Sequence, residues 1–502
     1  MSETVILNEK QTVAKKLLRE FIKQKEHKKF YLFGYAGTGK TYTVSGMIFE
    51  FLRQHVLHHV YVCAPTHQAL NVIETYFRSV VKNEDLLTLE SNISFLTIHK
   101  LLEFKPVIQN EDGTKVFKST KESKFMKHLD ERLIIIDECS MISKVMIDEL
   151  NKYIELYPIK ILFMGDSAQL PPVSEPISKI FNEVKNNYPY HLVLDEIMRT
   201  NSSEIKDISS IIREWNKKDS LGPSFLNIHN RKITPKTFKL YHHKPQLKDS
   251  IWFKKFIKDV NDGKFPIILT WRNNPAETYN DTVRKIIHNC ENIDDYMVDD
   301  HLMFSNFYAV PGQILKVFYT SDMIRILKIK TDKIKLFDWS VAMIPDSDHL
   351  ADKTYNRLIK SFMKLDNEIE VDLMTVQKIY SNISIEDIGK KSSIQTIRLS
   401  QQKKYIEYID RIKSDLESFF KQFKHDNHTS KLWEIFHKNL LDPFAKLNFG
   451  YSITVHKSQG STFSTVYVDV VDITINPIEE EMQKSLYTAS TRASKELFFI
   501  VK

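Results

Sequence analysis

Short apolar runs alternate with amphipathic stretches along much of the chain. The runs are rich in β-branched and aromatic residues, and each ends in a polar cluster, which is typical of buried parallel strands. They lie at residues 30–33, 60–64, 133–137, 161–166, 265–270 and 466–470. Strands that alternate with helices predict an α/β fold, and in such folds the loops after the strands carry the chemistry.

Two segments depart from this pattern. In residues 103–118, two strand-like runs flank Asp112-Gly113, which predicts a β-hairpin. Between about 290 and 445 the parallel pattern fades. There, residues 316–339 predict antiparallel strands and residues 403–423 predict an amphipathic helix. We therefore expect a small insertion near the hairpin and a larger inserted domain further along the chain.

Composition narrows the class of protein. The 502 residues suffice for several domains, and no apolar run approaches the roughly 20 residues of a membrane-spanning helix. The N-terminal residues carry charges where a secretory signal needs an apolar stretch, so we expect no export. The three cysteines form no CxxC, which argues against a disulfide framework or a zinc ribbon. A net charge of +7 permits a polyanionic partner without requiring one.

Glycine marks the first candidate site. Only 12 glycines occur in the chain, yet three fall within residues 34–39. Residues 34–41 match G-x-x-x-x-G-K-[ST] between a predicted strand and a helix-forming stretch, so the loop is expected to cradle ATP phosphates. Lys40 would reach the β- and γ-phosphates, and the Thr41 hydroxyl would hold Mg²⁺. The other expected nucleotide contacts of this loop are Gly37, Thr38 and Gly39.

Two further strands end in residues suited to hydrolysis. Asp137 and Glu138 follow the strand at 133–137. Asp137 would complete the Mg²⁺ shell, and Glu138 would accept the proton of the attacking water. Gln169, after the strand at 161–166, would contact the γ-phosphate. An Asp-Glu pair alone is usually a solvated loop, but its place at a strand end favours a catalytic role.

The motifs resemble, in content and order, those of superfamily-1 helicases of the RecD-like, Dda-like branch. The resemblance rests on residues 7–11, 34–41, 64–69, 97–102, 137–141, 165–173, 194–200, 452–462 and 486–493. It implies two RecA-like motor domains, with a pin hairpin inserted in the first and a mixed, partly antiparallel, SH3-like β and helical insertion in the second. The implied limits are 1–190 for the first domain with its pin at about 103–130, 191–290 and 446–502 for the second, and 291–445 for the insertion.

The resemblance also implies residue roles. Gln11 would read adenine, and Gly460 would lie at the nucleotide. Arg199 and Arg492 would be arginine fingers that stabilise charge on the transferred phosphate, although either alone could be a surface ion-pair arginine. The implied strand contacts are Pro65, Thr66, His67, Thr97 and His99 from the first domain, and Thr454, His456 and Lys457 from the second.

Two points are left open by the sequence. UvrD-type helicases place a tyrosine before the arginine corresponding to Arg199, whereas this chain has Met198, which puts base selectivity in doubt. Phe104 or Phe117 of the hairpin would be the strand-separating wedge, and core packing is an equal alternative for either.

The resemblance implies an ATP- and Mg²⁺-dependent helicase that moves 5′→3′ on single-stranded DNA and unwinds forked duplexes, in replication, repair or recombination. It would be a monomeric motor away from membranes, with single-strand-binding or replisome proteins as candidate partners. An RNA helicase, a P-loop NTPase without strand separation, and a non-catalytic binding module are the rivals. Abundant lysine, isoleucine and asparagine suggest an AT-rich genome such as that of a virus, and we expect the protein in the cytoplasm or nucleoid of a cell.

Overall fold

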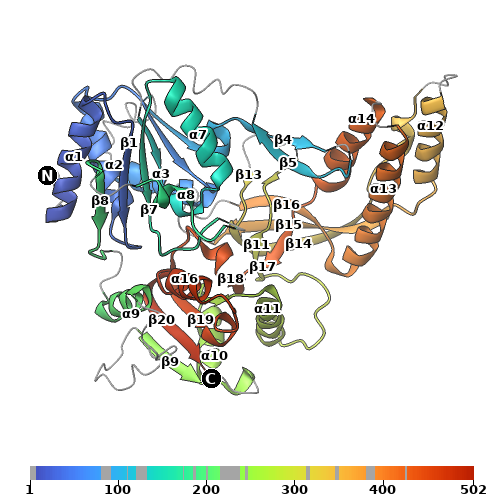
Figure 1. Ribbon diagram of the computed structural model, residues 1–502. Coiled ribbons are helices and arrows are strands. Elements are labelled where there is room, and N and C mark those ends of the chain that lie inside the picture. The colour runs from blue at the N-terminus through green and yellow to red at the C-terminus, as the bar shows by residue number, and fades with distance from the viewer. Residues whose placement is uncertain are drawn as a thin grey trace.

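Three sheets organise the protein in the computed structural model (Figure 1). Two are parallel and flanked by helices, and the third is antiparallel. The structure describes residues 7–80, 92–109, 111–119, 133–172, 175–184, 188–198, 202–214, 238–242, 247–311, 317–344, 350–379, 391–423 and 427–501. The predicted combination of two parallel-sheet domains with a hairpin and a mixed insertion is thereby confirmed.

The first sheet has the strand order β3-β2-β6-β7-β1-β8, and all of its pairs are parallel. Its strands are β1 (Lys29–Gly34), β2 (Val60–Ala64), β3 (Ile93–Thr97), β6 (Leu133–Ile136), β7 (Lys160–Gly165) and β8 (His191–Leu194). β8 pairs with β1, so this sheet extends four residues beyond the expected domain limit at 190. We call this sheet, its helices and its hairpin the first lobe.

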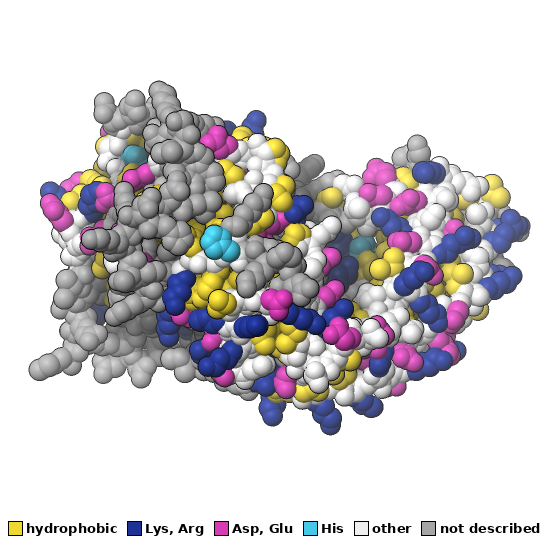
Figure 2. Space-filling view, turned by 90° about the horizontal axis from the view of Figure 1, so that it is seen from below, with side chains coloured by type: hydrophobic (Ala, Val, Ile, Leu, Met, Phe, Trp, Pro, Cys, Tyr) yellow, Lys and Arg dark blue, Asp and Glu magenta, His cyan; other side chains and the backbone are white. Residues whose placement is uncertain are grey.

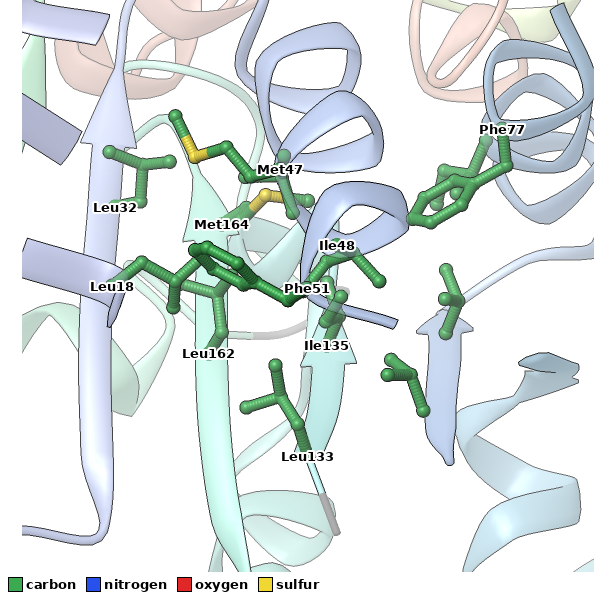
Figure 3. Close-up of a cluster of buried hydrophobic side chains, with 14 of the residues drawn as sticks. Leu18, Leu32, Met47, Ile48, Phe51, Phe77, Leu133, Ile135, Leu162 and Met164 are labelled. Atoms are coloured by element: carbon green, nitrogen blue, oxygen red, sulfur yellow. The ribbon is translucent and has the colours of Figure 1, made fainter. Parts of the chain in front are cut away.

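Alternation along these strands explains why the first lobe has two cores. Ile135 points to the cluster under α1 (Glu9–Lys23), α2 (Lys40–Arg53) and α3 (His67–Val80) (Figure 3). Its neighbours Ile134 and Ile136 point to the opposite cluster. That cluster is covered by α5 (Ile98–Leu101), α7 (Lys144–Leu156) and α8 (Lys179–Asn182). Successive strand residues face opposite sides, so a run that is apolar throughout is buried on both faces.

The second lobe is built in the same way around the order β18-β10-β19-β20-β9. Its strands are β9 (Phe238–His242), β10 (Ile267–Thr270), β18 (Ser452–Thr454), β19 (Phe463–Asp469) and β20 (Ala493–Val501). One face packs against α9 (Ser203–Glu214), α15 (Val470–Ile473) and α16 (Glu479–Ser490). The other packs against α10 (Ile251–Asn261) and α11 (Asn273–Ile287). β18 follows the insertion in the chain and still pairs with β10, so the insertion leaves this sheet intact.

The inserted domain holds the antiparallel sheet, in the order β16-β15-β14-β11-β17. Its strands are β11 (His301–Phe304), β14 (Met323–Lys335), β15 (Glu368–Lys378), β16 (Lys391–Ile397) and β17 (Leu447–Phe449), beside the small pair β12 (Tyr308–Ala309) and β13 (Val317–Phe318). The predicted antiparallel strand and the helix near 403–423 are both confirmed, as β14 and α13 (Gln402–Gln422). β17 closes this sheet slightly beyond the expected limit at 445.

Helices α12 (Leu350–Phe362), α13 and α14 (Asn427–Ile435) form the outer end of the inserted domain (Figure 1). A π-helical turn, Phe436–Leu441, continues α14. The hairpin of the first lobe, β4 (Phe104–Ile108) and β5 (Lys115–Ser119), reaches toward α14. Its formation confirms the Asp112-Gly113 turn signal. Short 3₁₀ turns lie at Cys139–Met141, Leu247–Asp249, Trp339–Ala342, Leu399–Gln401 and His456–Ser458.

The described surface carries both signs of charge. Lysine and arginine side chains alternate with aspartate and glutamate across the face seen in Figure 2. Among the described residues, no helix is long and apolar enough to cross a membrane. The three cysteines are free thiols, as their spacing predicted.

Candidate nucleotide and strand-binding site

The loop between β1 and α2 depends on glycine at several positions. Gly37 and Gly39 have φ values of 82° and 73°, in the left-handed region that glycine adopts without steric cost. At Gly34 a Cβ atom would lie 2.4 Å from the Leu194 carbonyl oxygen of β8. The loop therefore needs glycine both for its turns and for the close approach of two strands.

Lys40 and Thr41 lie at the N-terminus of α2, where the phosphate-binding pattern predicts them. Lys40 Nζ donates to the carbonyl oxygens of Gly34 and Tyr35, each at 2.9 Å. Thr41 Oγ1 donates to Asp137 Oδ2 at 2.6 Å. A hydroxyl and a carboxylate oxygen thus lie together at the helix N-terminus, which favours anions.

This oxygen pair fits a magnesium ion. Mg²⁺ prefers hard oxygen ligands and usually keeps water and substrate phosphates in its shell, so one or two protein ligands suffice. Within the described part of the chain, no group of three or more histidine, cysteine, aspartate or glutamate side chains could hold a metal. Thr41 with Asp137 is therefore a suitable donor set for a phosphate-bound ion.

Glu138 has an unusual backbone. Its φ and ψ are 52° and 41°, in the left-handed region that costs a non-glycine residue roughly 1–2 kcal/mol. Its amide donates to Asp137 Oδ1 at 2.8 Å. Strained residues of this kind are concentrated at functional sites. The turn fixes the directions of the two adjacent carboxylates relative to each other.

Gln169 is 4% exposed, and its Oε1 has no hydrogen-bond partner within the described residues. A buried acceptor without a partner is costly and needs an explanation. The next residue, Leu170, lies between the lobes. Its amide donates to Thr488 Oγ1 at 3.3 Å, and its carbonyl accepts from Gln459 Nε2 at 3.0 Å. Gln169 is therefore next to the lobe interface, where a water molecule beside the nucleotide could donate to its Oε1.

Gln11 begins α1 in a capping box with Asn8. The Asn8 amide donates to Gln11 Oε1 at 3.0 Å, and the Gln11 amide donates to Asn8 Oδ1 at 2.8 Å. Gln11 Nε2 donates to the Thr38 carbonyl at 3.3 Å. Gln11 therefore contacts the phosphate-binding loop directly, and its adenine-reading role stays a prediction.

The two predicted arginine fingers are placed differently. Arg199 lies outside the described residues, although the amide of Met198, just before it, donates to the Gly37 carbonyl at 2.6 Å. Arg492 is 1% exposed and donates within its own lobe, to the carbonyls of Thr488 and Ser461, each at 3.1 Å. The flanking residues of Arg492 nevertheless line a small cavity opposite the phosphate loop. That cavity is bounded by Ala36, Ile197, Ile205, Lys206, Ser209, Thr491 and Ala493.

The strand motifs of the two lobes meet at Ala69 and Gly460. A Cβ on Gly460, whose φ is 82°, would be 3.5 Å from Ala69 Cβ. Gly460, expected at the nucleotide, therefore lies against the residues that follow Pro65, Thr66 and His67. Thr66 Oγ1 accepts from the Ala69 amide at 3.2 Å. Thr97 Oγ1 accepts from the Lys100 amide at 3.2 Å and caps α5.

His67 stacks on Tyr319 of the inserted domain. The ring centroids are 3.8 Å apart and the planes differ by 16°. Phe307, which is 58% exposed, lies 5.7 Å from the Tyr319 ring. Neither aromatic belongs to a helicase motif, so sequence reasoning did not single them out. Only the fold brings Tyr319, at the end of the β13 segment, to a histidine about 250 residues earlier in the chain.

Burial keeps the strand-motif histidines neutral. Desolvation, together with Lys100 and His99, lowers the pKa of His67 to about 4. Burial also lowers the pKa of His99 and, against the opposing influence of Glu481, that of His456. Neutral imidazoles suit stacking and hydrogen bonding rather than ion pairing with phosphate.

The remaining strand residues of the second lobe surround β18. Thr454 is buried and lies opposite Thr270 in the parallel register of β18 and β10. Lys457 follows His456 in a 3₁₀ turn, and its carbonyl accepts from Ser321 Oγ of the inserted domain at 3.5 Å. This contact and the Tyr319 stack tie the inserted domain to the strand motifs of both lobes.

The hairpin phenylalanines lie away from its tip. Phe104 begins β4, packs against the core under α5 and α7, and meets His99 edge-on at 6.0 Å. Phe117 pairs with Pro106 in the register of β4 and β5, and its side chain lies outside the described set. The contacts of Phe104 favour the packing alternative for that residue.

Sequence profiles of two protein families match the chain. Residues 19–175 match the family described as "AAA domain", and residues 449–500 match "UvrD-like helicase C-terminal domain". These matches cover the phosphate loop and the carboxylate strand in one lobe and the strand motif with Arg492 in the other. The two lobes and their site thus define a P-loop motor of the helicase class.

Two relatives span nearly the whole chain. "Uncharacterized protein R530" of Acanthamoeba polyphaga mimivirus is 49% identical over 497 residues, which cover 99% of this chain and 100% of that protein. "Uncharacterized protein MJ1519" of Methanocaldococcus jannaschii is 25% identical over 94% of this chain, which spans 36% of that longer protein. The chain belongs to the same family as the mimivirus protein.

Solved structures of Pif1 helicases also align with the chain. The enzyme from Candida albicans is 16% identical, with 99% of this chain and 95% of that chain covered and a TM-score of 0.43. The enzyme from Bacteroides in complex with ADP-AlF3 and single-stranded DNA is 14% identical, with 99% and 92% covered and a TM-score of 0.46.

Proposed function

We propose that the chain is a DNA helicase that moves 5′→3′ along single-stranded DNA and separates duplexes, driven by ATP hydrolysis in the cleft between its lobes. The main supporting observation is that the same two lobes meet both at the nucleotide site and at the strand-binding motifs. Beside Gln169 in the cleft they meet through Leu170 and Thr488, and at the strand motifs through Ala69 and Gly460. A change in the cleft therefore acts on the strand-binding surface.

In the proposed reaction, each cleft residue has one task. Lys40 binds the β- and γ-phosphates, and Glu138 accepts a proton from the water that attacks the γ-phosphate. Gln169 accepts from that water through its Oε1 and donates to the γ-phosphate through its Nε2. Thr41 and Asp137 would hold Mg²⁺, which neutralises charge on the phosphates. Arg199 and Arg492 would approach the transferred phosphate, Arg492 from the second lobe.

On the strand side, we propose that bases stack against the aromatic pair of His67 and Tyr319. Base stacking on aromatic rings tolerates any sequence, which suits a motor that must pass along the whole strand. Lys457 and the motif residues Pro65, Thr66, Thr97, His99, Thr454 and His456 would hold the sugar-phosphate backbone. The net charge of +7 is compatible with such a partner.

Strand separation is assigned to the hairpin of β4 and β5. Its position beside α14 supports a role as a fixed obstacle, because the inserted domain holds its tip. The mimivirus relative supports a virus-encoded protein that acts on DNA inside a host cell. Single-strand-binding or replisome proteins remain candidate partners, and we propose a monomeric motor.

The decisive experiment compares duplexes with a 5′ tail, a 3′ tail or no tail, each with DNA and with RNA tails. We expect ATP- and Mg²⁺-dependent separation of the duplex with a 5′ DNA tail, at least tenfold faster than the others. A preference for the 3′ tail would overturn the polarity, and a preference for RNA tails would favour the RNA helicase. Hydrolysis that is indifferent to any added strand would favour an NTPase without strand separation.

A further inference from the structure

Arg213 is an arginine of the second lobe that reaches the phosphate loop without belonging to any helicase motif. Its side chain is 14% exposed, and Nη1 forms an ion pair with Asp166 Oδ1 of the first lobe. The guanidinium also lies 4.0 Å from the ring centroid of Tyr35, the second residue of the phosphate loop. Arg213 thus contacts two segments of the opposite lobe, close to the nucleotide site.

The hydroxyl of Tyr487, on α16, completes this contact. It donates to Asp166 Oδ2 at 2.7 Å and accepts from the Ala36 amide at 2.9 Å and from Arg213 Nη1 at 3.1 Å. A phenol has one donor and two acceptor sites, so all of its hydrogen-bonding capacity is used. Burial and Asp166 raise the pKa of Tyr487, which keeps the hydroxyl protonated. Together, Tyr35, Ala36, Asp166, Arg213 and Tyr487 form what we call the cleft bridge.

Helix α9 presents a polar face to the cleft. Lys206 and Ser209 line the cavity beside Ala36, and Arg213 follows four residues after Ser209 on the same face. The adjoining face, with Ile205, Ile208 and Ile212, belongs to the core shared with α16. A displacement of Arg213 is therefore transmitted to the packed helices of the second lobe, because such cores do not deform continuously.

The cleft bridge does not explain stability well. A buried ion pair loses hydration when it forms, so such pairs are weak arguments for stability and better candidates for specificity or switching. Burial disfavours the charge on Arg213, but Asp166 and Tyr487 outweigh it and the pKa of Arg213 is raised. The carboxylate of Asp166, which pairs with the buried Arg213, comes from the opposite lobe, so this ion pair exists only while the lobes are together.

Tyr35 connects this bridge to the phosphate-binding lysine. Lys40 Nζ donates to the Tyr35 carbonyl, while Arg213 lies over the Tyr35 ring. When Lys40 binds phosphate, its ammonium must exchange carbonyl contacts for phosphate oxygens. The backbone of Tyr35 then loses a hydrogen bond on one side while its ring remains under Arg213 on the other.

We propose that Arg213 is a positioning residue that couples nucleotide binding to closure of the two lobes, acting through Tyr35, Asp166 and Tyr487. This inference rests on the proposed two-lobe motor. It gives a role to α9, a helix that lies outside all of the recognised helicase motifs. Arg213 does not need to touch the nucleotide. Its planar guanidinium combines an ion pair with ring stacking, which a lysine cannot fully replace.

The test measures lobe closure directly, independently of any strand. Fluorophores are attached at Leu156→Cys of α7 and Ile251→Cys of α10, which are 73% and 68% exposed, in a Cys290→Ser background. Energy transfer is recorded with and without ADP-aluminium fluoride and Mg²⁺. We expect a nucleotide-dependent change in the parent protein, a change reduced at least twofold in Arg213→Ala, and an intermediate change in Arg213→Lys.

Arg398→Ala is the matched control. Arg398 is also a partly buried arginine, 28% exposed, and it pairs with Asp295 at 2.7 Å within the inserted domain. It should leave the nucleotide-dependent change intact. A full change in Arg213→Ala, or an equal reduction in Arg398→Ala, overturns the proposal, as does a parent protein whose lobes do not respond to nucleotide.

Steady-state kinetics supply the second readout. For Arg213→Ala, we expect the strand-stimulated kcat to fall at least tenfold while the KM for ATP changes less than threefold. Tyr487→Phe should show a smaller fall in kcat, again with little change in KM. If Arg213→Ala does not fold, Tyr487→Phe serves as the test of the proposal. Loss of kcat that merely follows a loss of folded protein in thermal unfolding contradicts a positioning role. If the parent protein does not unwind DNA but its closure still depends on Arg213, the helicase proposal is rejected while the role of Arg213 stands.

Discussion

The first lobe touches the rest of the chain in two chemically different ways. In the cleft it does so through buried polar groups, with the Tyr487 hydroxyl shared among Asp166, Ala36 and Arg213. At the hairpin it does so by close packing, since a Cβ on Gly113 would lie 2.2 Å from Trp433 Cζ3. Two directed contacts add to this packing: His437 Nε2 lies 2.8 Å from the Gly113 carbonyl oxygen, and the exposed Lys115 pairs with Asp442 at 2.9 Å.

The difference indicates which contact can change during a reaction cycle. Hydrogen bonds and ion pairs can be exchanged for others when phosphate arrives, at little net cost. A glycine pressed against a buried tryptophan has no alternative partner, because packed interiors tolerate little displacement. We therefore expect the cleft to rearrange during hydrolysis while the hairpin moves together with α14.

The largest effect should come from breaking the cleft itself. Lys40→Ala removes the ammonium that binds the β- and γ-phosphates, and we expect kcat for ATP to fall by about 10²-fold or more. Binding of single-stranded DNA should stay within about twofold, because the strand motifs lie elsewhere. ATPase assays and fluorescence anisotropy with a labelled oligonucleotide measure the two quantities.

Lys152→Ala is the control for this substitution. Lys152 is an exposed lysine of the same lobe that pairs with Glu149 at 2.9 Å. It should hydrolyse ATP at the parent rate. Normal hydrolysis by Lys40→Ala would show that the nucleotide site has been assigned wrongly.

The next effect concerns the packed contact. Gly113→Ala places a methyl group inside the Trp433 ring system and forces a left-handed φ of 67° on alanine. We expect the hairpin tip to leave α14, at a cost of about 2–3 kcal/mol in unfolding free energy. Duplex separation should fall at least tenfold while strand-stimulated ATP hydrolysis stays within about threefold. Parallel unwinding and ATPase assays test this.

Gly263→Ala separates backbone strain from the clash. Gly263 has a similar φ of 76°, but nothing lies within 4 Å of an added Cβ. It should lose only about 1 kcal/mol and keep unwinding intact. Equal losses of unwinding in both variants would mean that the hairpin contact with Trp433 is not what matters.

Local patterns in the sequence predicted the parts of the molecule that depend on local physics. The apolar run with Ile134, Ile135 and Ile136 predicted a doubly buried strand because both faces of a parallel sheet are covered. The glycine-rich loop and the Asp112-Gly113 turn were predicted because their backbone conformations restrict the residue type. These predictions needed no knowledge of distant residues.

Contacts between distant segments could not be predicted in this way. Arg213 lies in an ordinary amphipathic helix, and nothing nearby in the chain indicates Asp166 or Tyr35 as its partners. Trp433 is one apolar residue among many until the fold brings it to Gly113. Residues 191–194 were not among the predicted strands, and only the fold shows that they pair with β1 beyond the implied domain limit at 190. The tertiary arrangement decides each of these cases.

The stack of His67 on Tyr319 is a third type of contact, and a base of the bound strand could stack against it. Tyr319→Ala should weaken binding of single-stranded DNA about tenfold, since stacking of one base on an aromatic ring contributes about 1–3 kcal/mol. Tyr319→Phe keeps the ring and should bind like the parent protein. Equilibrium anisotropy at fixed salt measures both, and equal affinities for all three proteins would remove Tyr319 from the strand path.

The smallest effect is a dependence on pH that belongs to the strand side. The pKa of His67 is about 4 in the folded protein, below its ordinary value of 6.5. As pH falls from 7 to 5, His67 becomes protonated in the unfolded chain but stays largely neutral in the folded protein. Protonation therefore stabilises the unfolded chain, and the folded protein loses stability over this pH range. After allowance for solvent screening, His67 accounts for a loss of about 1 kcal/mol in the free energy of unfolding between pH 7 and pH 5.

His67→Gln removes this share, because glutamine does not titrate. The parent protein should therefore lose about 1 kcal/mol more than His67→Gln between pH 7 and pH 5, as measured by urea unfolding at each pH. His99 and His456, whose pKa values are also lowered, contribute similarly to both proteins and cancel in the difference. Identical losses in the two proteins would mean that His67 is as hydrated in the folded state as in the unfolded chain. That result would contradict a buried stack of His67 with Tyr319. The comparison between the polar contacts of the cleft and the packed contact of the hairpin would then rest on Arg213 and Gly113 alone.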